Sequence, residues 1–307
     1  MTDVRVALFV VGEKGLHVLR ASLAYYRRII SYVVIGRDLG VSNDFFEEIK
    51  SVCVEYDLPF YSRGAEPCLA SDDDYFYRIC IGWRWLISCN KNLIVLHDSK
   101  LPAYRGFNPL VTALLNKDKE ISVSAIFADN DADSGDVIIC KSRFVDYPIK
   151  VCDAIKLSIE IYVEIVVFLL EKMLSGENIL GIAQSSEYAS YSVWRDDYDY
   201  FIDWSESSEF ISRFCDSVGY PYAGAKSFMN GKLVRVVECV VFEDVNIVRR
   251  EKNIGKILFF SDKKPVVICG SGLVKLIKIE NFSDLSEIRD LSIRTRFFSN
   301  NGRYYHV

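Results

Sequence analysis

Short apolar runs alternate with helix-length segments along the first half of the chain, and this alternation limits the fold more than any other feature. The run at 4–11 is apolar almost throughout. Strands that are buried on both faces and separated by helices are typical of a parallel sheet. We therefore predict an α/β domain with a mostly parallel, doubly wound sheet. Its further expected strands lie at 30–35, 58–61, 75–81, 93–96, 123–127 and 137–141, the last two as a hairpin, and its expected helices at 16–28, 44–56 and 108–115.

The second half of the chain has a different pattern. A long helical pattern at 151–174 closes the first domain, and its stripe of charged residues argues against a membrane-spanning helix. Beyond a helix expected at 208–218, short β runs at 233–242, 256–260, 265–269 and 273–279 predict a small antiparallel barrel. We expect a catalytic domain over 1–180, a linker with a helix over 181–225 and a C-terminal β-rich domain over 226–307.

Charge and cysteine usage narrow the class of protein. The net charge of −5 argues against a nucleic-acid partner, which usually requires a basic face. Nine cysteines are scattered without any Cys-x-x-Cys pair, which favours reduced thiols over a disulfide framework or a metal site. The first residues show no basic start or small-residue cleavage site. We therefore expect a cytoplasmic protein without membrane or metal binding.

Two polar loops follow strand-like runs and are the strongest candidates for a site. His97, one of only three histidines, follows the run at 93–96 and precedes a Pro/Gly segment. The acidic stretch 131–136 follows the run at 123–127. A carboxylate beside an imidazole orients the ring and stabilises its charged form. A lone histidine is also often a structural residue.

The turn at 12–15 lacks a dinucleotide fingerprint, so we interpret it as a strand-to-helix turn that touches an anion.

Both loops resemble motifs of the folate-dependent formyltransferases, a family that includes methionyl-tRNA, glycinamide ribonucleotide and bacterial sugar N-formyltransferases. The segment His97-Asp-Ser-Lys-Leu-Pro-Ala-Tyr-Arg-Gly106 resembles the family's Asn-x-His-x-Ser-Leu-Leu-Pro hallmark and the Tyr/Phe-x-Gly that often follows it. The segment 128–138 resembles the family's Asp-x-Gly loop, and the segments 194–204 and 219–225 resemble its linker. The resemblance implies that His97 and Asp133 are the catalytic histidine and aspartate.

The match departs from the family at two positions. Val95 stands where the family has an asparagine whose amide donates to the formyl oxygen, and Lys100 replaces a leucine. Loss of one such donor costs about 3 kcal/mol of transition-state stabilisation. Either another donor replaces it (protonated His97, a backbone N–H or the Lys100 ammonium), or the domain has lost catalysis and kept binding. We favour an active enzyme because His97 and Asp133 are both present.

The resemblance also implies a cofactor, 10-formyltetrahydrofolate, and places for its pterin ring and for the acceptor. Core packing is the alternative role for the aromatic residues, and a solvated face is the alternative for the basic ones. We expect Trp204 to pack on the first domain. The cofactor-binding candidates are Gly82, Trp83, Arg84, Trp85, Asp129, Asn130 and Asp131, and the substrate-binding candidates are Tyr104, Arg105, Trp194 and Arg195.

The hypothesis from the sequence is therefore a folate-dependent N-formyltransferase. We expect its acceptor to be an amino sugar linked to a nucleotide, used in lipopolysaccharide or O-antigen synthesis, because the linker segments resemble those of sugar enzymes. Sugar formyltransferases are often dimers, so a homodimer is a further expectation. The alternatives are a non-catalytic folate or sugar-nucleotide binding protein, a methionyl-tRNA formyltransferase, and a nicotinamide-dependent enzyme.

Overall fold

A computed structural model describes residues 4–67, 75–87 and 91–299, which form two compact units. Among these described residues, the first unit holds those up to 113, 118–146 and 153–194, and the second holds 114–117, 147–152 and those from 195 onward. The earlier boundaries at 180 and 225 stay predictions. No helix among the described residues is both long enough and apolar enough to cross a membrane.

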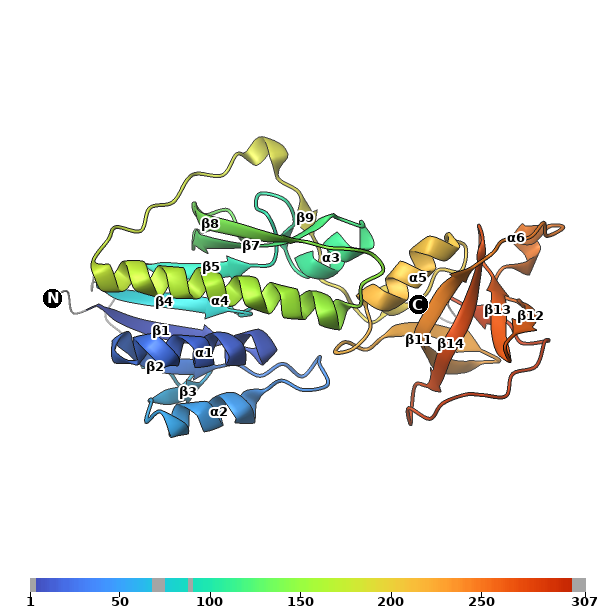
Figure 1. The fold of residues 1–307 in the computed structure, drawn as a ribbon, viewed down its shortest axis with the longest axis horizontal. Helices are drawn as coiled ribbons and strands as arrows, with labels where there is room; N and C mark the ends of the chain where they lie inside the picture. The colour runs from blue at the N-terminus through green and yellow to red at the C-terminus, as the bar shows by residue number, and fades with distance from the viewer. Residues whose placement is uncertain (1–3, 68–74, 88–90, 300–307) are drawn as a thin grey trace, which may run out of the picture. The chain divides into compact units, whose positions relative to one another are not determined.

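A seven-stranded sheet forms the centre of the first unit, in the order β3-β2-β1-β4-β5-β7-β8 (Figure 1). The pairs from β3 to β5 are parallel, and those of β7 with β5 and with β8 are antiparallel. The mostly parallel sheet and the hairpin are thus confirmed. The strands are β1 Arg5–Val10, β2 Ile30–Ile35, β3 Phe60–Ser62, β4 Phe76–Ile81, β5 Leu93–His97, β7 Glu120–Phe127 and β8 Val137–Phe144.

Strand β1 shows why the sheet is buried on both faces. Five of its six residues are buried, and successive side chains point to opposite faces, so neither face is open to water. The chain runs outward from β1 to β3 on one side and from β4 to β8 on the other. This reversal beside β1 and β4 is where ligands bind in open α/β sheets.

The helices are α1 Gly12–Tyr26, α2 Phe46–Glu55, α3 Pro109–Leu115 and α4 Val151–Ser175, with short 3-10 turns at Arg27–Ile29, Ser186–Tyr188 and Tyr198–Tyr200.

A small parallel pair joins the segment after β5 to the segment after α4. Strand β6, Arg105–Gly106, pairs with β9, Tyr191–Ser192. Neither strand is predicted from the sequence, because two-residue strands carry no periodicity. The long helix α4 contacts β5 at the hydroxyl of Tyr162, which donates to the carbonyl of Leu96 (3.2 Å). These contacts bring the end of β5 into the interior of the unit.

The second unit contains a six-stranded antiparallel sheet in the order β12-β13-β14-β11-β10-β15. Its two edge strands meet, because the N–H of Phe297 donates to the carbonyl of Gly255 (2.7 Å) and Lys256 bridges Arg296. This closure confirms the barrel-like domain. Its elements are α5 Ser208–Ser217, β10 Ala225–Met229, β11 Lys232–Phe242, α6 Arg250–Asn253, β12 Ile257–Ser261, β13 Lys264–Ile268, β14 Leu273–Asn281 and β15 Phe297–Phe298.

Two features of this unit correct the expectations. Strand β10 is not predicted, although Asn230 and Gly231 both have positive φ (51° and 78°) and form the Asn-Gly turn typical of a two-residue hairpin. Trp204 does not belong to the first unit's core. It is 2% exposed, and its Nε1–H donates to Ser227 Oγ (3.0 Å) within the second unit. The ring is large and apolar and its N–H requires an acceptor, and the barrel supplies both.

Candidate active site

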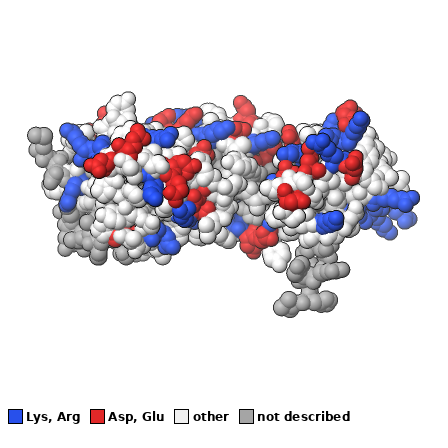
Figure 2. Space-filling view, turned by 90° about the horizontal axis from the view of Figure 1, so that it is seen from below, with Lys and Arg blue, Asp and Glu red and all other residues white. Residues whose placement is uncertain are grey.

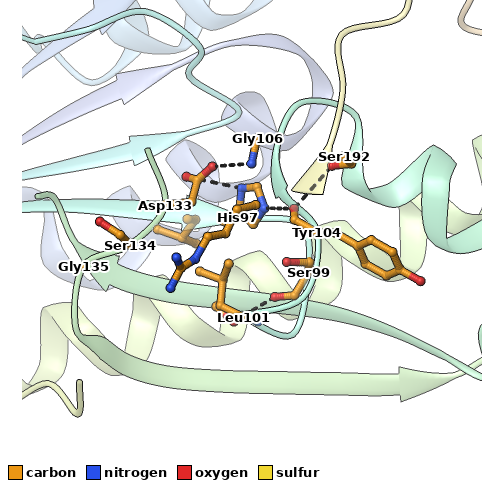
Figure 3. A network of polar contacts seen from close by, with 12 residues as sticks. His97, Ser99, Leu101, Tyr104, Gly106, Asp133, Ser134, Gly135 and Ser192 are labelled. Atoms are coloured by element: carbon orange, nitrogen blue, oxygen red, sulfur yellow. Dashed lines mark hydrogen bonds and ion pairs between the residues drawn. The ribbon is translucent and has the colours of Figure 1, made fainter. Parts of the chain in front are cut away.

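His97 ends strand β5 and is almost buried, at 7% exposure. Its Nε2 lies 2.8 Å from the carbonyl oxygen of Tyr104, in the loop that follows (98–107, the His loop; Figure 3). The hydroxyl of Ser192, on β9, donates to the same carbonyl (3.3 Å). A carbonyl oxygen can only accept a hydrogen bond, so Nε2 carries a proton and donates it.

Asp133 faces the other side of the same ring. It lies in the loop between β7 and β8 (128–136, the Asp loop), with Oδ1 3.5 Å from His97 Nδ1. Its Oδ2 accepts the backbone N–H of Gly106 (2.8 Å), as Figure 3 shows. The side chains of His97 and Asp133 are 8% and 17% exposed, so little water screens their interaction. The structure therefore brings the two predicted residues together.

The surroundings of both ring nitrogens bear on which protons His97 carries. The Nε2–H is engaged with Tyr104, so a neutral ring would turn the lone pair of Nδ1 toward the Asp133 carboxylate, and two acceptors would face each other. A second proton on Nδ1 converts this repulsion into a charge-assisted contact. The geometry therefore favours an imidazolium paired with a carboxylate.

Asp133 reaches His97 by an indirect route. Strand β7 is antiparallel to β5, so Phe127 at the end of β7 lies beside Ile94, near the start of β5. His97 is three residues further along, which is about 10 Å in a strand. The Asp loop therefore folds back along β5. Gly135 allows this, because a Cβ there would lie only 1.8 Å from the carbonyl oxygen of Phe127.

Gly106 is a second position where only glycine fits. Its φ is +96°, and an added Cβ would lie 2.5 Å from the carbonyl oxygen of Ser192. Both the backbone conformation and the close approach of β9 exclude a side chain. The N–H of the same residue holds Asp133, so this glycine fixes the carboxylate as well as the pairing of β6 with β9.

A partly buried ion pair at Asp98, the residue that follows His97, is not predicted from the sequence. Lys14, in the first turn of α1, lies 2.5 Å from Asp98, which also accepts the hydroxyl of Ser158 (2.9 Å). Burial by itself raises the pKa of Asp98, but the Lys14 ammonium and the Ser158 hydroxyl outweigh it and lower that pKa below its usual range. The turn at 12–15 thus contacts an anion of the protein itself.

The segment predicted to hold the cofactor follows β4. Gly82 has φ +63°, and a Cβ there would lie 3.0 Å from the Val11 carbonyl oxygen. The ring of Trp83 packs edge-on against that of Trp85, and its buried indole N–H has no hydrogen-bond partner among the described residues. Arg84 forms an ion pair with Asp38. One of these four candidates, Trp83, thus has a buried donor for which the described part of the chain offers no acceptor.

The acidic part of the predicted cofactor site is open to solvent. Asp129, Asn130 and Asp131 are all exposed at the start of the Asp loop. Asp129 accepts the N–H of Asn130 (2.7 Å), and the Asp131 carbonyl accepts the hydroxyl of Ser134 (2.9 Å). These contacts shape the loop and leave the carboxylates at the surface. Their role toward a cofactor stays a prediction.

The predicted substrate residues have different surroundings. Arg105 is 7% exposed, and its guanidinium donates through two nitrogens to Gln184. Trp194 is 54% exposed and packs edge-on against Phe107 (5.4 Å between ring centroids). Arg195 is the first residue of the second unit's segment from 195 onward, and its buried Nε has no hydrogen-bond partner among the described residues. The site of the acceptor stays a prediction.

A cavity of about 420 Å³ lies beside the His loop, with Tyr104 in its lining. Neither His97 nor Asp133 lines it, so it is not the centre of the predicted reaction. Lys100 also borders it, 71% exposed and 4.0 Å from Glu120. Glu120 lies four residues from the strand partner of His97, about 13 Å along β7, so the Lys100 ammonium is too distant to act as the replacement donor.

Val95 lies on the same face of β5 as His97, because side chains two residues apart in a strand share a face. It is partly buried and packs against an apolar cluster that includes Phe9 and Cys80. The described residues contain no group of three or more His, Cys, Asp or Glu side chains arranged for a metal ion.

Two family models match the chain: Formyl transferase over residues 76–147 and Formyl transferase, C-terminal domain, over 196–284. Curated relatives include methionyl-tRNA formyltransferases of Syntrophomonas wolfei (29% identity; 47% of this chain and 45% of the relative) and Halothermothrix orenii (30%; 61% and 59%). The chain thus spans about half the length of the curated relatives it matches.

Solved structures share the fold at low identity. A sugar 3N-formyltransferase, WlaRD, solved in the presence of dTDP and 5-N-formyl-THF, matches with a TM-score of 0.63 and 14% identity, over 94% of this chain and 99% of the other. The N-formyltransferase of Helicobacter canadensis, in complex with folinic acid and dTDP-3-aminofucose, matches with a TM-score of 0.66 and 13% identity, over 89% and 98%. With matches to both of its domain models and the same two-part fold, the chain belongs to the formyl transferase family.

Proposed function

We propose that the protein transfers a formyl group from 10-formyltetrahydrofolate to the amine of an amino sugar. The observation that carries this proposal is the contact of His97 with Asp133 at the positions where the family resemblance puts the catalytic pair. The fold of two structural relatives that were solved with formylated folates supports the same cofactor class. The wild-type arrangement is compatible with acyl transfer because both side chains are shielded and oriented.

The residues after β4 fit a folate. Its pterin ring is a planar group rich in hydrogen-bond acceptors and donors, and the unpartnered indole N–H of Trp83 is a donor of the required kind. Once bound, 10-formyltetrahydrofolate would supply a formyl group whose oxygen takes up negative charge under attack by the amine, while N10 leaves with the proton that the amine loses. Trp83 and Trp85 would contact the cofactor's ring system.

The protein's own groups suit the stabilisation of that negative charge. With Nε2 toward the carbonyl oxygen of Tyr104 and Nδ1 toward the Asp133 carboxylate, His97 suits electrostatic stabilisation and proton donation better than uptake of the amine's proton. Asp133 holds the ring in place and favours its charged form. The Nε2–H becomes available to a substrate when it leaves the carbonyl oxygen of Tyr104.

This arrangement also suggests which group replaces the family's asparagine, at whose position this chain has Val95. Val95 has no donor, and Lys100 is too distant, so protonated His97 is the group that we assign to this role. The competing function is a non-catalytic folate or sugar-nucleotide binding protein of the same fold, and the apolar packing of Val95 is the observation that favours it.

For the acceptor, we favour a nucleotide-linked amino sugar, with surface glycan synthesis as the setting. One structural relative was solved with dTDP-3-aminofucose. The curated relatives favour initiator tRNA instead, because they are methionyl-tRNA formyltransferases. The net charge of −5 opposes tRNA, and Figure 2 shows acidic and basic side chains both present along the face, with basic ones gathered at its right end. A cytoplasmic location and a homodimer remain parts of the proposal.

A single-turnover assay tests the reaction. The protein is mixed with 10-formyltetrahydrofolate and, in separate reactions, nucleotide-linked amino sugars or methionyl-tRNA, and tetrahydrofolate release is followed beside a folate-binding titration. We expect transfer to a sugar and a loss of about 100-fold or more in His97→Ala. His17→Ala, at an exposed position of α1, is the matched control. Full turnover in His97→Ala would refute the assignment, and folate binding without transfer to any acceptor would establish the non-catalytic alternative.

A further inference from the structure

The chain that leaves α4 crosses both loops of the candidate site. Ile182 bridges Val137 at the end of the Asp loop, with reciprocal backbone hydrogen bonds of 2.9 Å. Further along, Ser190 accepts from the N–H of Tyr104 (2.9 Å), and β9 pairs with β6 in the His loop. The segment 182–192, which we name the strap, is therefore hydrogen-bonded to both loops.

Gln184 is the residue of the strap that touches both loops with one side chain. Its Nε2 donates to the carbonyl oxygens of Asp133 (2.9 Å) and Gly135 (2.7 Å). Its Oε1 accepts from Nε and Nη2 of Arg105 (3.2 and 2.7 Å). The amide thus donates to the Asp loop and accepts from the His loop. Of the common side chains of this length, only glutamine offers both functions, because glutamate cannot donate and methionine can do neither.

We propose that Gln184 is a positioning residue for the reaction and sets the distance between His97 and Asp133. This inference rests on the proposed function. Asp133 is fixed at its carbonyl by Gln184 and at its carboxylate by Gly106, and Arg105 immediately precedes Gly106. A change at Gln184 therefore acts on both attachments of the carboxylate. The assignment also gives Arg105 a role: its buried guanidinium contacts the strap and holds the His loop against it.

Two substitutions separate the two halves of the amide. Gln184→Glu keeps an acceptor for Arg105 and loses the donors to the Asp loop, whereas Gln184→Met loses both. We expect kcat to fall by about 10- to 100-fold in each, with KM changed by less than about threefold, because misplacement by a fraction of an ångström acts on the transition state. Glu187→Gln, exposed on the same strap, is the matched control and should leave both constants unchanged.

The positioning role has a readout besides activity. The ring ¹⁵N signals of His97, recorded at one fixed pH, distinguish an imidazolium from either neutral tautomer, and the chain has only three histidines to assign. We expect both Gln184 variants to shift these signals toward a neutral ring, with unfolding as cooperative as in the wild type. The double variant Arg105→Met/Gln184→Met should lose no more kcat than Gln184→Met alone, because the two side chains act as one unit.

The result that overturns the inference is a folded Gln184→Met protein with wild-type kcat and unchanged His97 ring signals. A loss confined to KM would also overturn it. If Gln184→Met does not fold, the ring signals and kcat of Gln184→Glu decide in the same way. If the wild type transfers no formyl group to any acceptor, the proposed function fails by itself, and the His97 spectra of the variants still show whether Gln184 sets the contact with Asp133.

Discussion

Replacement of Lys14 with Met is expected to destabilise the protein near neutral pH, because it leaves the Asp98 carboxylate charged and without its cation. The two charged groups are 2.5 Å apart, and their side chains are only 15% and 20% exposed. Removal of one partner of a buried pair costs about 3–5 kcal/mol. The remaining exposure and the hydrogen bond from Ser158 reduce this, so we expect the free energy of unfolding to fall by about 2–3 kcal/mol.

The pH dependence follows from the pKa of Asp98, which is lowered in the folded protein. A carboxyl group with a lowered folded-state pKa contributes stability above its unfolded-state pKa, and this contribution is lost as the pH falls through the folded value. In Lys14→Met, the ammonium that lowered the pKa of Asp98 is gone, so burial raises this pKa above its wild-type value. Protonated Asp98 requires no cation. The difference in stability between wild type and variant is therefore largest near neutral pH and shrinks in acid.

Urea unfolding of the wild type and Lys14→Met, at neutral and at acidic pH, measures this difference. Asp98→Asn and the double variant complete a cycle that isolates the pair. Lys156→Met is the matched control, because Lys156 pairs with Asp153 at the surface, where such a pair contributes less than about 1 kcal/mol. A loss below about 0.5 kcal/mol in Lys14→Met, or an equal loss at both pH values, would refute the reasoning about the buried pair.

Three further substitutions test the site. Val95→Asn should lower the unfolding free energy by about 1–2 kcal/mol in urea unfolding and change turnover by less than about fivefold; a 100-fold gain would show that the site lacks its donor. Gly106→Ala should cost at least about 2 kcal/mol, since its positive φ and the Ser192 carbonyl both oppose a Cβ, and wild-type stability in the same assay would contradict this. Ser124→Ala leaves the buried N–H of Leu101 unpaired and should cost about 1–3 kcal/mol; an unchanged denaturation midpoint would contradict that role.

Sequence patterns predicted the elements whose burial is regular. The near-continuous apolar run of β1 and the alternation with helices were sufficient for the parallel sheet, because a strand covered on both faces has few polar positions. Elements without periodicity were missed, as the two-residue strands β6 and β9 show. Strand β10 differs from these two, because its Asn230–Gly231 turn is a sequence signal for a hairpin and would have predicted the strand.

Part of the candidate site was likewise predictable from the sequence, and part was not. The residue types around His97 and in the Asp loop indicated the chemistry, and the structure brings His97 and Asp133 into contact. The sequence did not predict that β7 is antiparallel to β5, which requires the Asp loop to fold back. The ligand role suggested for Arg105 stays a prediction. The sequence did not indicate that its side chain is buried against Gln184, which lies 79 residues away in the chain.

By itself, then, the sequence determined the local properties of this protein: which segments form strands and helices, and which loops hold an imidazole, a carboxylate and a left-handed glycine. Only the tertiary structure decided which distant residues contact one another. Asp98 became the partner of Lys14, and the strap became the partner of both loops. The physical reason is that backbone preference and hydrophobic period act over a few residues, whereas a hydrogen bond or ion pair depends on distance in space. That distance is set by how the strands are ordered in the sheet.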